Sequence, residues 1–204
     1  MSRPTLALAA LGLLAATPAT DANKDGDTSL GEYVAAFERI AAASDADADG
    51  YLTLEEIQTF AELTRELQVV DEFDLFDSNE NGVLELAEYQ QARKSTDPML
   101  VLQSAVSNGL LNADDENSQA KMMAWMEETQ RVNERARERT TAFLSLPADY
   151  NPYDFASRDP DRADQASVEY LRFEHVVRFM TLDRNEDRVI DREESLRTDP
   201  FAEN

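Results

Sequence analysis

The sequence has no cysteine, one histidine and only six glycines, and its 19 Lys and Arg residues face 42 Asp and Glu residues. The lack of cysteine excludes disulfides, thiolate zinc sites and cysteine nucleophiles. The formal net charge of −23 argues against nucleic acid and anionic lipid as partners, because phosphates are bound by clustered Lys and Arg. No glycines are spaced as in a phosphate-binding loop. What remains is an acidic chain that is 42% hydrophobic, enough for a core.

The first 19 residues have the composition of a secretory signal peptide. Arg3 precedes an apolar stretch from Leu6 to Ala16, and Thr17-Pro18-Ala19 ends in a small residue. The apolar run is too short to span a bilayer, and a basic start before such a run is typical of an export leader. We therefore expect cleavage after Ala19 and a mature protein in the periplasm or outside the cell.

One twelve-residue pattern occurs three times in the first half of the chain. Residues 21–32 read DANKDGDTSLGE, residues 45–56 read DADADGYLTLEE, and residues 77–88 read DSNENGVLELAE. Each has Asp at position one, Asp or Asn at positions three and five, Gly at six and Glu at twelve. An acidic loop can match part of this pattern by chance, but three complete matches make chance a poor explanation.

The pattern suits a hard cation that takes about six to eight oxygen ligands. Side chains at positions one, three and five and the carbonyl of position seven converge, and glycine at six permits the turn at positive φ. A glutamate at twelve that binds through both oxygens favours calcium over magnesium. The predicted ligands are Asp21, Asn23, Asp25, Asp27 and Glu32 in loop one, Asp45, Asp47, Asp49, Tyr51 and Glu56 in loop two, and Asp77, Asn79, Asn81, Val83 and Glu88 in loop three.

A fourth loop, residues 183–194, reads DRNEDRVIDREE and departs from the pattern at position six, where Arg188 replaces glycine. Holding a non-glycine residue in the left-handed conformation costs about 1–2 kcal/mol. We expect this loop to bind calcium more weakly than the others. Its predicted ligands are Asp183, Asn185, Asp187, Val189 and Glu194.

The four loops resemble those of the EF-hand family, in which a helix precedes and follows each calcium loop. The resemblance implies an all-α fold with short β-bridges between paired loops, and calcium as the bound ion. We divide the chain into a signal peptide (1–19), a region with three calcium loops (20–94), a helical insert with an irregular stretch (95–165) and a C-terminal EF-hand with a degenerate loop (166–204).

Distances along the chain predict how the loops pair. Loops one and two share the helix expected over residues 30–43, which is about 21 Å long, so they cannot bridge each other. Between loops two and three there is room for two short helices and a turn near residues 66–68, so these loops are expected to pair. Loop one is then left for loop four, with Thr28 facing Ile190.

The insert is expected to contain a buried helix over residues 97–111 and an amphipathic helix over 118–146. Met122, Met123, Trp125 and Met126 lie close together in the second helix. We favour core packing for this cluster, and the alternative is a groove that calcium exposes to a partner. His175 has apolar neighbours and is expected to be packed rather than a ligand.

The predicted activity is reversible calcium binding, and its biological role stays open. One alternative is a calcium-responsive protein that recognises a protein partner, and the other is structural or buffered calcium. An enzyme is not expected, because the sequence presents no nucleophile with a base beside it. We also expect no nucleic-acid partner, and no membrane span once the leader is removed.

Overall fold

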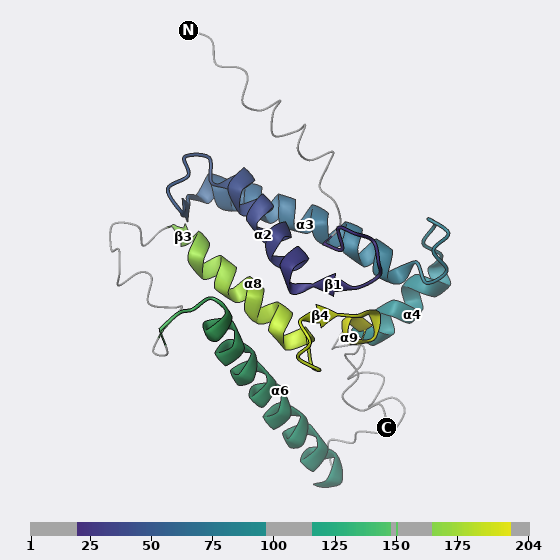
Figure 1. Ribbon diagram of the computed structural model, residues 1–204. Coiled ribbons are helices and arrows are strands. Elements are labelled where there is room, and N and C mark those ends of the chain that lie inside the picture. Colours follow the sequence, from purple (N-terminus) through teal and green to yellow (C-terminus); the bar gives the residue numbers. More distant parts are fainter. Residues whose placement is uncertain (1–19, 97–115, 148–149, 151–164, 197–204) are drawn as a thin grey trace.

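The computed structural model describes residues 20–96, 116–147, 150 and 165–196 (Figure 1). The expectations for residues 1–19 and 97–111 lie outside these ranges. The described part is mostly helical, as predicted, and its strands have two residues each. The elements are β1 (Thr28–Ser29), α2 (Leu30–Ser44), β2 (Tyr51–Leu52), α3 (Leu54–Phe76), α4 (Leu86–Thr96), α6 (Glu116–Phe143), β3 (Ala166–Ser167), α8 (Val168–Leu182), β4 (Val189–Ile190) and α9 (Arg192–Leu196).

Helices α2, α3 and α8 begin and end in the same way. The N-cap residues Ser29, Thr53 and Ser167 each accept a hydrogen bond from the backbone N–H three residues further on. Such caps stabilise a helix by about 1 kcal/mol. Each of the three helices ends at an Asp that is also the first residue of the next loop; these residues are Asp45, Asp77 and Asp183. Local sequence therefore fixes where each loop starts and stops.

Two pairs of short strands join distant parts of the chain. Strand β1 pairs antiparallel with β4, and Thr28 lies opposite Ile190. The predicted pairing of loops one and four is thus confirmed. Strand β2 pairs with β3, and Leu52 lies opposite Ala166. Loop two is therefore joined to the segment before α8, and its predicted pairing with loop three is wrong.

The reason is the continuity of α3, which runs for 23 residues without the turn expected near residues 66–68. At about 1.5 Å per residue the helix is about 34 Å long, so loops two and three lie at its opposite ends. The sequence Glu66-Leu67-Gln68 contains no helix breaker. Leu67 is buried against Ala36 and Ile40 of α2, a contact that keeps this part of α3 helical.

The core forms where α2 and α8 pack side by side (Figure 1). The two strand pairs connect the start of α2 to the end of α8 and the end of α2 to the start of α8, so these helices run antiparallel. Helix α6, from the predicted insert, packs along α8, so the insert shares the core with the regions that carry the loops. The buried core residues are Leu30, Ala136, Phe173, Val176, Val177, Phe179, Met180 and Ile190.

Helix α6 is longer than the helix it packs against, with 28 residues compared with 15 in α8. Ala136, near its C-terminal end, is buried, whereas Met123 and Met126 are 62% and 61% exposed. The prediction that these two methionines pack in the core is therefore wrong. In the ranges described above, no helix is both long and apolar enough to cross a membrane.

Candidate metal centre

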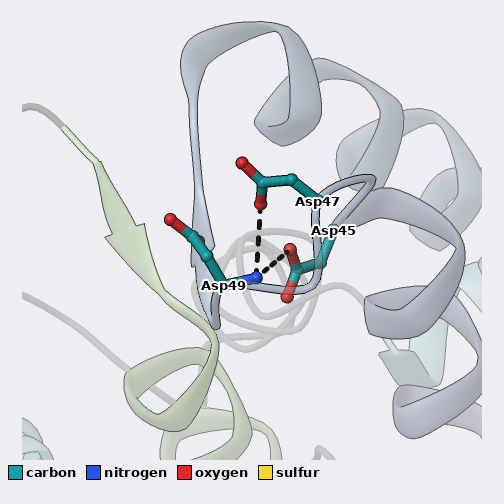
Figure 2. A group of neighbouring side chains, drawn as sticks. All are labelled: Asp45, Asp47 and Asp49. Atoms are coloured by element: carbon teal, nitrogen blue, oxygen red, sulfur yellow. Dashed lines mark hydrogen bonds between the residues drawn. The ribbon is translucent and has the colours of Figure 1, made fainter.

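Three carboxylates converge in loop two, between α2 and α3 (Figure 2). Asp45, Asp47 and Asp49 each place one oxygen within 4.8 Å of the others. The Asp49 N–H donates to Asp45 Oδ1 at 3.1 Å and to Asp47 Oδ1 at 3.2 Å, which curls the loop around the three side chains. Like charges held this close repel each other. The arrangement therefore favours a bound cation.

The same hydrogen bonds recur in all four loops. The carboxylate at position one accepts from the N–H at position six, and the side chain at position five accepts from the N–H at position seven. The first bond joins Asp21 to Gly26 at 2.9 Å, Asp45 to Gly50 at 3.0 Å, Asp77 to Gly82 at 2.7 Å and Asp183 to Arg188 at 3.2 Å. The second joins Asp25 to Asp27, Asp49 to Tyr51, Asn81 to Val83 and Asp187 to Val189. The sequence pattern thus specifies one loop geometry four times.

Two positions of each loop adopt left-handed backbone. Position six has φ of +93° at Gly26, +81° at Gly50 and +76° at Gly82, and Arg188 adopts +69° in loop four, as its place in the pattern predicts. Position four is left-handed as well, with φ between 57° and 65°, although sequence reasoning did not anticipate it. These residues are Lys24, Ala48, Glu80 and Glu186.

The glutamate at position twelve reaches back across each loop. Glu32 Oε1 accepts from Asn23 N–H at 3.3 Å, and Glu56 Oε1 accepts from Ala46 N–H at 2.8 Å. Hydrogen bonds lower the pKa of both carboxyls: the Ser29 hydroxyl is the main cause at Glu32, and the Thr53 N–H is the main cause at Glu56. Both side chains therefore stay anionic and ready to bind a cation.

Glu88 and Glu194 make the corresponding contacts in loops three and four. Glu88 Oε1 accepts from Asn79 N–H at 3.3 Å, and Glu194 Oε1 accepts from Asn185 N–H at 3.2 Å. All four predicted glutamates therefore close their loops. Each set of predicted ligands lies within one loop, and the structure brings no ligand from one loop into another.

Loop four is the most buried of the four. Asp183 is completely buried and Glu194 is 8% exposed. One oxygen of each, Asp183 Oδ1 and Glu194 Oε2, is buried without a hydrogen-bond partner. A carboxylate oxygen left in this way is costly unless a cation compensates it. Positions one and twelve of this loop therefore fit a metal ion.

The partner of loop two was missed in the sequence. Tyr51 and Leu52 lie opposite Ser167 and Ala166, as Ser29 and Thr28 lie opposite Val189 and Ile190. Ala166 and Ser167 thus take the places of loop positions eight and nine, and the Val168 N–H donates to the Gly50 carbonyl at 3.0 Å, as the Leu30 N–H donates to the Arg188 carbonyl at 2.9 Å.

Counting back from Ala166 puts Asp159 at position one and Asp161 at position three. Position five is then Ala163, position six Asp164 and position twelve Tyr170. Two of the three short-range ligands are present but the glycine and the glutamate are absent, so a search for the full pattern passes over this segment. Residues 159–164 lie outside the described ranges. The available signal was the helix cap at Ser167.

Loops two, three and four each lie between two helices, an arrangement typical of helix–loop–helix metal sites. A sequence model described as EF hand matches residues 43–61, which hold loop two, the end of α2 and the start of α3. This match supports an EF hand at loop two, and the carboxylate cluster of Figure 2 lies inside the matched segment, which supports calcium binding. No curated protein and no solved structure matches the chain.

Proposed function

We propose that this chain is an exported protein that binds calcium in loops one, two and three and more weakly in loop four. The observation that carries the proposal is that the position-one carboxylate accepts a hydrogen bond from the position-six N–H in four separate loops. In each loop the ligands are the side chains at positions one, three, five and twelve, together with the carbonyl at position seven. Calcium takes about six to eight oxygens of these kinds.

The position of the loops supports a structural role for the ions. Loops one and two flank α2, loop four follows α8, and the apolar faces of these two helices make the core. An ion that binds only the folded loops adds its binding free energy to the stability of the fold. We expect calcium to raise the melting temperature and chelator to lower it, as followed by circular dichroism.

The binding proposal is tested by calorimetric titration of four variants: Glu32→Gln, Glu56→Gln, Glu88→Gln and Glu194→Gln. Glutamine is also found at this capping position, so the helix start is retained while the ligand charge is lost. We expect each of the first three changes to remove one high-affinity ion from the measured stoichiometry. Glu62→Gln, on the exposed face of α3, is the matched control. Unchanged stoichiometry in all the loop variants would contradict the proposal.

A second candidate function is calcium-dependent recognition of a protein partner. It is favoured by the exposure of Met123 and Met126 on one helix, since methionine adapts to varied apolar surfaces. Fluorescence of an apolar dye should then change on calcium addition, and Met123→Ser/Met126→Ser should abolish that change. A dye signal that is independent of calcium would leave the structural role as the better account.

Export is supported by the leader-like composition of residues 1–19 and by the surroundings of Thr20. The Thr20 N–H donates to Asp71 Oδ1 at 2.8 Å, and Thr20 is buried. Cleavage after Ala19 would turn this amide into an ammonium group beside a carboxylate, a favourable pair. Mass spectrometry of the protein recovered from the periplasm or medium should find Thr20 at its N-terminus, and a full-length mass there would contradict this part of the proposal.

A further inference from the structure

An arginine from the insert binds the first ligand of loop four. Arg139, on α6, forms an ion pair with Asp183 through Nη2 and Oδ2. Its Nη1 donates to the Asp183 carbonyl at 2.9 Å and to the Met180 carbonyl at 3.2 Å. The Arg139 side chain is 19% exposed and that of Asp183 is completely buried. The guanidinium therefore fixes both the carboxylate and the end of α8.

This arrangement distinguishes loop four from the other loops. Within the described ranges, the position-one residues Asp21, Asp45 and Asp77 form no ion pair. The ion pair at Asp183 occupies only Oδ2, whereas Oδ1 is buried and has no hydrogen-bond partner. One oxygen of the same carboxylate is thus held by an arginine and the other remains for a cation.

Helix α6 makes a second contact with the loop. Arg135 pairs with Glu186, which occupies position four of loop four and is not a predicted ligand. Two residues further on, Arg137 pairs with Glu174 of α8, outside the loop, at 3.3 Å. Three arginines of α6 therefore form ion pairs with α8 or its loop, and only Arg139 reaches a predicted ligand.

We propose that Arg139 is a positioning residue that sets the calcium affinity of loop four. It neutralises the buried Asp183 when the ion is absent and repels the divalent ion when it arrives, and both effects lower affinity. It also aims Oδ1 at the ion by holding Oδ2. Loop four consequently fills last, and its filling depends on the docking of α6 against α8. This inference rests on the proposed calcium function.

The test uses backbone amides as a separate reporter for each site. The N–H at position six contacts the position-one carboxylate in every loop, so the ¹⁵N-resolved signals of Gly26, Gly50, Gly82 and Arg188 follow the four loops individually. Calcium is titrated into the wild-type protein and into Arg139→Gln, Arg139→Lys and Arg137→Gln. Because a weakened ion-free state could unfold, the same affinities are also measured by removing calcium from the saturated proteins with a chelator.

Arg139→Gln should raise the affinity read at Arg188 by about tenfold or more, since a nearby positive charge is lost, and leave the three glycine signals unchanged. The ion-free form of this variant should unfold at lower urea concentration than the wild type. Arg139→Lys retains the charge and should bind as the wild type does, and so should the matched control Arg137→Gln. Equal or weaker affinity in Arg139→Gln, or the same gain in Arg137→Gln, overturns the proposal. If no signal of any loop responds to calcium, the proposed function itself fails.

Discussion

Mild acid should destabilise the protein through His175, at the contact between α2 and α8. The imidazole stacks on the ring of Tyr33 with centroids 4.0 Å apart, and its Nε2 lies 3.1 Å from the Tyr33 carbonyl oxygen. Burial lowers the pKa of His175 from 6.5 to about 4, the Tyr33 carbonyl opposes this shift, and the charge of Arg178 adds to it.

The sign and size of the effect follow from proton linkage. Because the folded pKa is lower than the unfolded one, the unfolded chain takes up the proton first, and stability is lost as pH falls from 6.5 toward 4. At about 1.36 kcal/mol per pKa unit, the full difference is worth roughly 3 kcal/mol, and most of it is gone at pH 4.5.

The assay is urea unfolding in chelator at pH 7.5 and pH 4.5, for the wild type and for His175→Phe. Phenylalanine keeps an aromatic ring against Tyr33 but does not titrate. The carboxylates titrate in both proteins, so the difference between the two pH dependences isolates the histidine. We expect the wild type to lose roughly 2–3 kcal/mol more than the variant over this interval. Equal losses in the two proteins would refute the assignment of the acid sensitivity to His175.

Three further outcomes are expected. Leu67→Ala removes a buried contact between α2 and α3 and should cost about 2–5 kcal/mol of unfolding free energy, whereas Val69→Ala, at a 61% exposed position, should change it by less than about 0.5 kcal/mol. Val168→Pro is compatible with the first turn of α8 but removes the hydrogen bond from the Val168 N–H to the Gly50 carbonyl. It should weaken calcium binding in loop two by about fivefold, as measured at the Gly50 amide. The calcium affinity measured at the Gly26 amide of loop one should not change. Arg188→Gly removes a side chain from a position with left-handed backbone. It should raise the unfolding free energy of the calcium-free protein by up to about 1 kcal/mol, measured by urea unfolding. A lower unfolding free energy would contradict the inference that Arg188 is strained.

The local features of the loops could be predicted from sequence because they depend on neighbouring residues. Gly50 and Arg188 were expected in left-handed conformation from their place in the pattern, and both adopt it. The pairing of Thr28 with Ile190 was also predicted correctly. This long-range contact was reached by elimination: helix length keeps loops one and two apart, and the second step, the pairing of loops two and three, is wrong.

The errors concern contacts that no short pattern encodes. The expected turn near Leu67 required a break that the sequence does not contain, and only the burial of Leu67 against α2 explains why the helix continues. Ala166 was passed over because its segment lacks the glycine and the glutamate of the pattern. The ion pair between Arg139 and Asp183 joins residues 44 positions apart, and it follows from the packing of α6 on α8, which periodicity alone does not determine.

The antiparallel arrangement of α2 and α8, with a strand pair at each end, gives the core an internal two-fold symmetry. The half from β1 to β2 and the half from β3 to β4 offer strand edges in the same order. Two chains that exchanged these halves would form the same strand pairs and the same core. In such an exchange the chain would cross from one copy to the other between β2 and β3.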